Sequence, residues 1–522
     1  MEGRAKNGIR NIVSGTANKL VLVLLPFFVR TIMVSSLGKE YLGLNSLFTS
    51  ILNVLNLTEL GFGSALVYSM YKPISDNDKT QICALLKLYK NIYRYIGCVL
   101  LIIGLILMPM IPQLINGEYP SGVNIYILYL IYLINTSISY FVFAHKKALL
   151  IAYQRNDIIS NINTVLSSIL YVLQIGILLT VKSYYIYVVV FPIFTIVENI
   201  YTAVVCSRKF PGIICKGNIS EEDKTSIKNH VKGIALQKIC SATRNSFDSI
   251  VISIYMGLTT IAIYNNYFYI LSAVHSILSQ IPNAIRASVG NSIASESLAK
   301  NYRDFSMMNF IYMWLNGFCS ICLFCLYQPF MKLWMGESLS FPMFTVTLFC
   351  IYFYELGMAD IISLYKDGAG LWWYGRYRVL IEAIANLILN FLLGRIWGVN
   401  GILIATIITL LFIGLGYGGY IVFHYYFKES SYLHYIFLQL KYFLITVLAI
   451  AIVYSVCYLI PIQGTLGLVL KGTACVGLGN AVLWIMLSRL KEYINAKRFV
   501  CGITGDLKEK FLCSLKYKGV DV

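Results

Sequence analysis

Long apolar stretches, separated by short charged or turn-rich segments, run along the chain from about residue 11 to residue 488. Many are about 20 residues long, which is the length that an α-helix needs to cross the hydrocarbon core of a bilayer. Strands of a membrane barrel would instead alternate apolar and polar positions over about ten residues. The pattern therefore predicts an all-α polytopic membrane protein.

About 14 transmembrane helices are expected. They cover residues 11–35, 41–71, 92–115, 123–144, 158–181, 184–205, 234–256, 260–284, 306–328, 340–362, 379–396, 399–423, 442–461 and 466–488. The charged connection 206–233 follows the sixth span, and we interpret it as a cytoplasmic linker. It would separate an N-terminal six-helix lobe, 1–205, from a second lobe.

Composition and charge placement support the membrane interpretation. Of 522 residues, 58% are hydrophobic and 13% are charged, whereas soluble domains carry about 25% charged residues, so an ordinary soluble enzyme is excluded. With a cytoplasmic N-terminus, 34 of the 42 Lys and Arg residues fall on the cytoplasmic side and five fall outside. This bias follows the positive-inside rule. It accounts for the net charge of +18 without nucleic acid and places both termini in the cytoplasm.

The first segment and the cysteines add two expectations. Met1–Arg10 is basic and leads into a long span without a small-residue cleavage site, so we expect a retained helix and not a signal peptide. None of the 13 cysteines falls in an expected external loop. Cys319, Cys322 and Cys325 are spaced by three along an apolar helix, but no histidine or second pair completes a metal site. We therefore interpret them as packing residues and expect no metal.

A weak internal repeat links the first junction of each half. Leu37-Gly38 before Leu42-Gly43-Leu44 has a counterpart in Met256-Gly257 before Ile261-Ala262-Ile263, with the glycines 219 residues apart. Since six spans restore the orientation of the chain, the halves would be parallel repeats. Chance similarity between apolar segments is the alternative.

Three bases lie inside expected spans. Lys19 and Arg30 are eleven residues apart, which places them on one helix face, about 16 Å apart, with Pro26 between them. Arg244 shares a polar stripe with Asp248 one turn later. A buried cation in a span faces a partner or an aqueous cavity. The alternatives are snorkelling of Lys19 and Arg30 to the interfaces and a structural Arg244–Asp248 pair.

Two further spans carry polar stripes. On 41–71 and 260–284 these are Asn45, Thr49, Asn53, Asn56 and Glu59, and Asn265, Tyr269, Ser272, Ser276 and Ser279. Such stripes line an aqueous route or hydrogen-bond neighbouring helices. Because they occur on the first two spans of each half, we expect a central cavity shared by the lobes.

The sequence offers little support for an enzyme. It has no Walker-type glycine loop for ATP, and the acids in expected external loops are few: Glu40, Glu118 and Glu337. No cofactor is implied.

Several segments resemble the Wzx-type polysaccharide flippases of the multidrug/oligosaccharidyl-lipid/polysaccharide superfamily. They are Lys6-Asn7-Gly8, Leu37 to Leu44, Glu59-Leu60-Gly61-Phe62-Gly63, Ala148 to Asn156, and Asp248 to Gly257. The resemblance covers most of the chain and does not indicate the sugar. It implies two six-helix lobes around a cavity, here completed by a C-terminal lobe at 234–426, and two extra helices with a basic tail at 427–522.

The resemblance also implies a function. Such proteins move undecaprenyl diphosphate-linked sugar repeat units outward across the bacterial inner membrane by alternating access. The exported units feed O-antigen, capsule or related polysaccharide assembly, with a polymerase and chain-length proteins as possible partners. The chain would then be a transporter in contact with the bilayer and not an enzyme.

The candidate residues fit this substrate chemically. Cations would hold the diphosphate, and amide and hydroxyl groups would hydrogen-bond the sugars. The candidate substrate-binding residues are Lys19, Arg30, Arg244, Asn53, Asn56, Asn265 and Tyr269. Asp248 or Glu59 is the candidate ion-coupling group, through a carboxylate that is protonated or ion-bound in one cavity state.

Two alternatives stay open. A cation-coupled multidrug exporter of the same fold would favour acids over bases in its cavity. A membrane glycosyltransferase would need donor-binding acids, and the loop cluster Glu221-Glu222-Asp223 is better explained as a helix start after Ser220.

Overall fold

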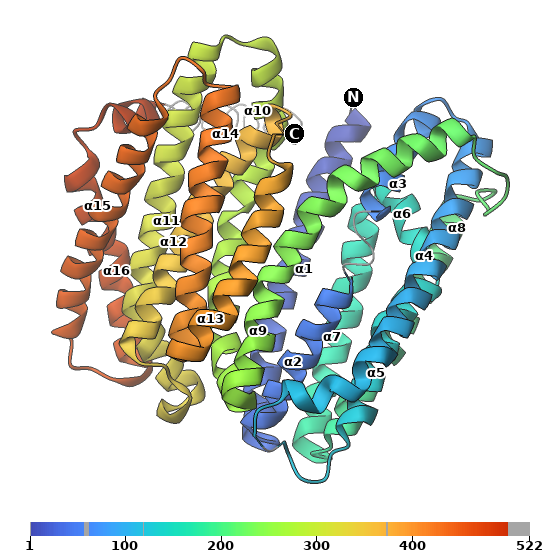
Figure 1. Cartoon of the computed structure of the whole chain (residues 1–522), viewed down its shortest axis with the longest axis horizontal. Coiled ribbons are helices and arrows are strands. Elements are labelled where there is room, and N and C mark those ends of the chain that lie inside the picture. The colour runs from blue at the N-terminus through green and yellow to red at the C-terminus, as the bar shows by residue number, and fades with distance from the viewer. Residues whose placement is uncertain (1, 57–61, 118, 372–373, 499–522) are drawn as a thin grey trace, which may run out of the picture. The chain divides into compact units, whose positions relative to one another are not determined.

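A computed structural model describes residues 2–56, 62–117, 119–371 and 374–498 (Figure 1). The chain is nearly all helical, at 87%, and no strand occurs among these residues. The predicted all-α class is therefore confirmed.

The elements follow one another with short connections. Up to the long connection at 210–220 they are α1 (Glu2–Ser36), α2 (Lys39–Leu55), α3 (Phe62–Ser75), α4 (Lys79–Leu107), η2 (Met108–Leu114), α5 (Ile125–Phe141), α6 (Ala144–Ala152), α7 (Asn156–Thr180) and α8 (Tyr184–Lys209). After it come α9 (Glu221–Leu278), α10 (Gln280–Ser295), α11 (Leu298–Met335), η3 (Glu337–Leu339), α12 (Met343–Gly368), α13 (Arg376–Thr409), η4 (Leu410–Tyr417), α14 (Gly418–Tyr425), α15 (Tyr432–Tyr458) and α16 (Gly464–Leu487).

The helices match the expected spans once two long stretches are divided. Within the described part of the chain, ten helices are long and apolar enough to cross a membrane, or eleven with the bent α5–α6 pair. Two of the ten, Ser246–Ser295 and Arg376–Tyr425, are 50 residues long, which is enough for two spans each. The expected second span, 41–71, falls on α2 and α3, with 57–61 outside the described residues.

The chain forms two compact units. The first comprises Met1–Asn266 and Ala383–Ile402, and the second Tyr267–Glu382 and Leu403–Val522. In the first unit α1 packs along α7, and α5 packs against α4 and α8; in the second, α15 and α16 pack against each other and against α11. The lobes at 1–205 and 234–426 stay a prediction.

The two C-terminal helices bury one face and leave the other exposed. Phe310 and Met313 of α11, Tyr442 and Val453 of α15, and Leu483 of α16 share one core. Phe437 and Leu444 on α15 are more than half exposed, at 67% and 52%. Exposed leucine and phenylalanine are stable on a helix whose outer face meets lipid.

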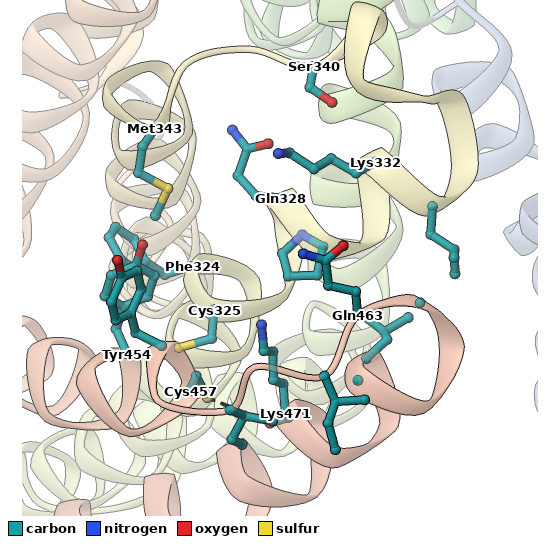
Figure 2. A pocket seen from close by; sticks show the side chains of 18 of the residues that line it. Phe324, Cys325, Gln328, Lys332, Ser340, Met343, Tyr454, Cys457, Gln463 and Lys471 are labelled. Carbon is teal, nitrogen blue, oxygen red and sulfur yellow. Dashed lines mark hydrogen bonds between the residues drawn. The ribbon is translucent and has the colours of Figure 1, made fainter.

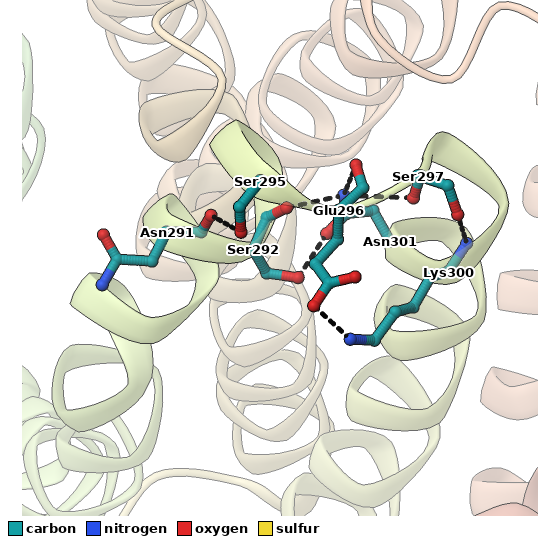
Figure 3. Close-up of polar contacts among 7 residues, drawn as sticks. All are labelled: Asn291, Ser292, Ser295, Glu296, Ser297, Lys300 and Asn301. Atoms are coloured by element: carbon teal, nitrogen blue, oxygen red, sulfur yellow. Dashed lines mark hydrogen bonds and ion pairs between the residues drawn. The ribbon is translucent and has the colours of Figure 1, made fainter.

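Side-chain caps fix the turn between α10 and α11 (Figure 3). The Ser297 hydroxyl accepts a hydrogen bond from the Lys300 amide, as an N-cap does. Asn301 is buried, donates to the Ser292 carbonyl at 3.0 Å and accepts from the Ser292 hydroxyl at 2.8 Å. Glu296 and Lys300 form an ion pair at 2.6 Å. The end of α10 and the start of α11 are thus held by one set of contacts.

Glycines break the helices at three junctions. Gly38 separates α1 from α2 with φ +117°, Gly257 interrupts α9 with φ +80°, and Gly398 interrupts α13 with φ +59°. Residues with a Cβ rarely adopt such positive φ angles. The junctions expected at Gly38 and Gly257 are confirmed as helix breaks.

The break in α9 is a close-packed point of the first unit. Asn116, from the segment after η2, donates from its backbone nitrogen to the Ser253 carbonyl at 3.0 Å and from its side chain to the Tyr255 carbonyl at 2.7 Å. Both carbonyls belong to the last turn before the break. A Cβ on Gly43 of α2 would lie 2.2 Å from the Leu258 carbonyl oxygen. The two repeat-related junctions therefore contact each other through a glycine.

Replacement of Gly43 by alanine should destabilise the protein. The new methyl would clash with backbone at Leu258, and backbone cannot move aside as a flexible side chain can, so a cost of about 1–3 kcal/mol is expected. Gly472→Ala on α16 is the matched control, because no atom lies within 4 Å of the added Cβ. The temperature at which each purified variant loses its monodisperse gel-filtration peak reports the difference. Equal melting of Gly43→Ala and wild type would contradict the close contact.

Candidate functional site

Arg30 is a half-buried cation within the span formed by α1. Its Nη1 donates to Oδ1 of Asn266 at 3.1 Å, and Asn266 is 1% exposed. It also interacts electrostatically with the hydroxyls of Tyr171 on α7 and Tyr187 on α8. The buried Asn266 amide thus accepts from the guanidinium inside the first unit, and the role of Arg30 in substrate binding stays a prediction.

The other two candidate cations are placed differently. Lys19, on the same helix, is exposed, which fits the snorkelling alternative better than burial. The backbone of Arg244 is helical within α9, but its side chain lies outside the described residues. The convergence of the three bases on one cavity remains a prediction.

Some residues of the polar stripe on α2 contact a neighbouring helix, and others are exposed. Asn45 accepts from the Tyr132 hydroxyl, and Asn56 accepts from the Tyr140 hydroxyl at 3.2 Å. Both tyrosines belong to α5, so these asparagines connect helices. Asn53 is exposed, and Glu59 lies outside the described residues.

The stripe on the second segment of α9 bonds mainly within its own helix. The hydroxyls of Ser272, Ser276 and Ser279 donate to carbonyls one turn earlier, at 2.9–3.1 Å. Tyr269 is half-buried. Asn265 pairs with Ser249 of the first segment at 3.4 Å, so it joins the two sides of the α9 break.

Asp248 lies in a buried polar cluster that joins three helical segments. Its Oδ2 accepts from the Tyr264 hydroxyl at 3.0 Å, and its Oδ1 accepts from Nδ2 of Asn390 on α13 at 2.6 Å. Asn390 also donates to Asn386 at 3.2 Å. All four residues are at most 2% exposed. A buried carboxylate with these partners is a candidate site for a proton or a small cation, since hard cations bind carboxylate and amide oxygens.

Three consecutive residues connect this cluster to Arg30. Tyr264 contacts Asp248, Asn265 contacts Ser249, and Asn266 contacts Arg30. The second segment of α9 thus touches the candidate ion-coupling group and the candidate substrate-binding cation over one turn of helix. A shift of this segment would change both environments together.

Sequence reasoning missed the partners of Asp248. Asn386 and Asn390 are four residues apart within an apolar span, so they share one helix face. This spacing was a detectable signal. Nothing in the sequence indicated that they lie close to a carboxylate 142 positions earlier in the chain.

Three other acids near the spans are paired with bases or hydroxyl groups. Glu382 bonds Arg378 at 3.1 Å, one turn before it on α13, and Glu198 bonds Lys147 at 2.7 Å. Asp360 accepts from the Tyr312 hydroxyl at 2.8 Å and lies 3.2 Å from His275. These contacts fit a structural role.

No protein-family model matches the sequence, and no curated protein matches it either. The structure is similar to that of a lipid II flippase, MurJ, in its inward closed conformation, with a TM-score of 0.69 and 14% identity over 92% of this chain and 98% of the flippase. It is also similar to an inward-facing multidrug resistance MATE transporter, with a TM-score of 0.62 and 14% identity over 81% of this chain and all of that one.

A MATE transporter from Vibrio cholerae is similar at a TM-score of 0.58 and 11% identity, over 83% of this chain and 99% of the transporter. These neighbours are transporters and not enzymes. The alignments cover nearly the full length of each neighbour, which excludes a match to a single fragment. The chain therefore has the fold that the lipid II flippase and the MATE transporters of the MOP superfamily share.

Proposed function

We propose that this chain is a flippase. It moves undecaprenyl diphosphate-linked oligosaccharide repeat units from the inner to the outer leaflet of a bacterial inner membrane by alternating access, as the Wzx-type resemblance implies. The units would supply O-antigen, capsule or related polysaccharide assembly, with a polymerase and chain-length proteins as partners. The fold shared with a lipid flippase over 92% of the chain supports this proposal.

The observation that carries the proposal is the position of Arg30. A guanidinium inside a span is expensive unless it serves a partner or a pathway. Here its Nη1 donates to the Asn266 amide oxygen, and a guanidinium stays charged and keeps its planar donor fork in any protein environment. That fork matches phosphate oxygens bidentately. A diphosphate headgroup is the part of the proposed substrate that needs such a contact most.

The cluster around Asp248 supports cation-coupled transport. Asp248 accepts hydrogen bonds from Tyr264 and Asn390, and Oδ1 of Asn390 has no hydrogen-bond partner in the described part of the chain. A proton on Asp248 or a small cation between these oxygens would satisfy that buried acceptor. Because Asn266 on the same turn holds Arg30, loading of the cluster would alter how Arg30 is presented to the headgroup.

A multidrug exporter of the same fold is the alternative. The MATE neighbours and the buried Asp248 carboxylate favour it. It predicts that expression lowers the susceptibility of a drug-sensitive host and that Arg30 is dispensable. The flippase proposal predicts unchanged drug susceptibility.

Arg30→Ala should abolish or severely reduce flipping. A charge-assisted hydrogen bond contributes about 1.5–3 kcal/mol, so headgroup binding should weaken about tenfold or more, and Arg30→Lys should restore only part of it. The assay uses proteoliposomes with a fluorescent undecaprenyl diphosphate-linked oligosaccharide, and measures the label that becomes accessible to a membrane-impermeant quencher.

Arg395→Ala on α13 is the matched control, since this arginine is exposed. Arg244→Ala tests the second candidate base and should also lose flipping. Wild-type flipping by both Arg30→Ala and Arg244→Ala, at equal protein level, would reject the cationic site and leave the fold assignment intact.

Asp248→Asn should uncouple transport from the cation gradient. The amide keeps the size of the side chain but cannot be deprotonated, so an imposed proton or sodium gradient should no longer accelerate flipping. The same liposomes with and without a gradient provide the measurement. Glu59→Gln tests the other candidate carboxylate in the same way. If the gradient accelerates flipping by both variants as it does for wild type, neither Asp248 nor Glu59 is the ion-coupling group.

Both termini should be cytoplasmic. Burial raises the pKa of Cys215 in the 210–220 connection, which slows its reaction with maleimides, so Lys216→Cys at the exposed neighbouring position is the better probe. Lys216→Cys and the native Cys513 should resist an impermeant maleimide in intact cells. Gln463→Cys, between α15 and α16, should react. Labelling of Lys216→Cys or Cys513 from outside would overturn the topology.

A further inference from the structure

Three cysteines from three helices meet in the second unit. They are Cys325 on α11, Cys457 near the end of α15 and Cys475 on α16, and their sulfur atoms all lie within 4.8 Å of one another. Cys457 and Cys475 are 3.8 Å apart, so they are free thiols and not a disulfide. The spacing on α11 is visible in the sequence, whereas the partners from α15 and α16 are not.

The arrangement suits a metal ion better than simple packing. A packing cysteine needs only an apolar surrounding, whereas here three sulfurs face one point. Ligands about 2.3 Å from a metal in tetrahedral geometry lie about 3.8 Å from each other, which is the Cys457–Cys475 separation. Cys322, one turn before Cys325, also interacts with Cys475 and is available as a fourth sulfur.

The cluster is buried yet reachable. The three cysteines are at most 3% exposed, but Cys325 and Cys457 line a pocket of about 1100 Å³ between α11, α12, α15 and α16. Figure 2 shows these two side chains in the pocket, with Lys471 beside them and Gln328 and Lys332 farther along its wall. In the expected topology, Lys332 lies in the connection after 306–328 and Lys471 at the start of 466–488, both on the external side, so the pocket would open to that side.

A lysine lies in the pocket that the thiols line. Metal ligation requires deprotonated thiols, and an isolated buried negative charge is costly. Lys471 lines the same pocket, and its carbonyl oxygen lies 3.9 Å from the Cys457 sulfur. A bound cation together with the Lys471 ammonium would offset the thiolate charge.

We propose that Cys325, Cys457 and Cys475 bind a soft, thiophilic metal ion, either Cu(I) or Zn(II), taken from the external side. Thiolate ligands select these ions over magnesium or calcium. Zn(II) would add Cys322 or a water molecule as the fourth ligand, and Cu(I) would be satisfied by three sulfurs. The bound ion would link α15 and α16 to α11.

Metal titration of the purified full-length protein tests this proposal. Under reducing conditions, Zn(II) and Cu(I) are each titrated against a chromophoric chelator. We expect a single equivalent of at least one ion to bind, with affinity that falls as the pH falls, because protons compete for the thiolates. If Cu(I) binds, thiolate-to-metal charge-transfer absorption should appear during the Cu(I) titration.

Cys475→Ala and Cys457→Ala should each weaken metal binding by at least about 10- to 100-fold. Removal of a group that only supports a ligand already costs that much, and these variants remove a ligand itself. Cys350→Ala on α12 is the matched control, because Cys350 is also buried but lies outside the cluster. A wild-type measurement covers the case that a variant does not fold: the metal should protect Cys457 from alkylation and leave the reaction of Cys98, which is exposed on α4, unchanged.

Three results would overturn the proposal. They are the absence of stoichiometric binding of either ion, equal affinity of wild type and Cys475→Ala, and a Cys457–Cys475 disulfide found by mass spectrometry in protein that takes up no metal. Each can occur while flipping and its dependence on Arg30 are unaffected, so failure of the metal site is distinguishable from failure of the proposed function.

Discussion

The need to satisfy backbone polar groups in the absence of water governs this structure. In the hydrocarbon core an unpaired carbonyl or amide costs several kcal/mol, so a chain crosses as a continuous helix unless something else supplies the missing bonds. At the break at Gly257, between the expected spans 234–256 and 260–284, Asn116 donates to the Ser253 and Tyr255 carbonyls. The close approach of Gly43 to Leu258 then packs α2 against the same point. The geometry on both sides of the break follows from these contacts.

That break creates the candidate site. It folds the second segment of α9 back so that Tyr264 and Asn265 reach Asp248 and Ser249 on the first segment. The next residue, Asn266, is thereby positioned to hold Arg30. A continuous helix would place residues 16 positions apart about 24 Å from each other along its axis. Proximity of the carboxylate to the cation-binding turn is thus a consequence of one glycine junction.

Polar side chains in the spans serve two different purposes. Asn45 and Asn56 accept from tyrosines of α5, and the serines after Tyr269 donate to their own helix. Arg30 and Asp248 instead are charged groups inside the first unit that contact the buried amides of Asn266 and Asn390. The two asparagines support the interhelical alternative for the stripes, the serines satisfy their own helix, and Arg30 and Asp248 carry the proposed chemistry.

The sequence by itself determined the helical class, the positions of the spans and the junctions at Gly38 and Gly257. These depend on apolar length and on backbone hydrogen bonding, which are local properties. It also singled out Arg30 and Asp248, since charges within apolar runs are visible without coordinates. Only the tertiary structure decided which groups meet them. Asn390 is 142 residues from Asp248, and Cys325 reaches Cys457 and Cys475 across three helices. Such pairs depend on how helix faces pack, because many packings are compatible with the same pattern of spans.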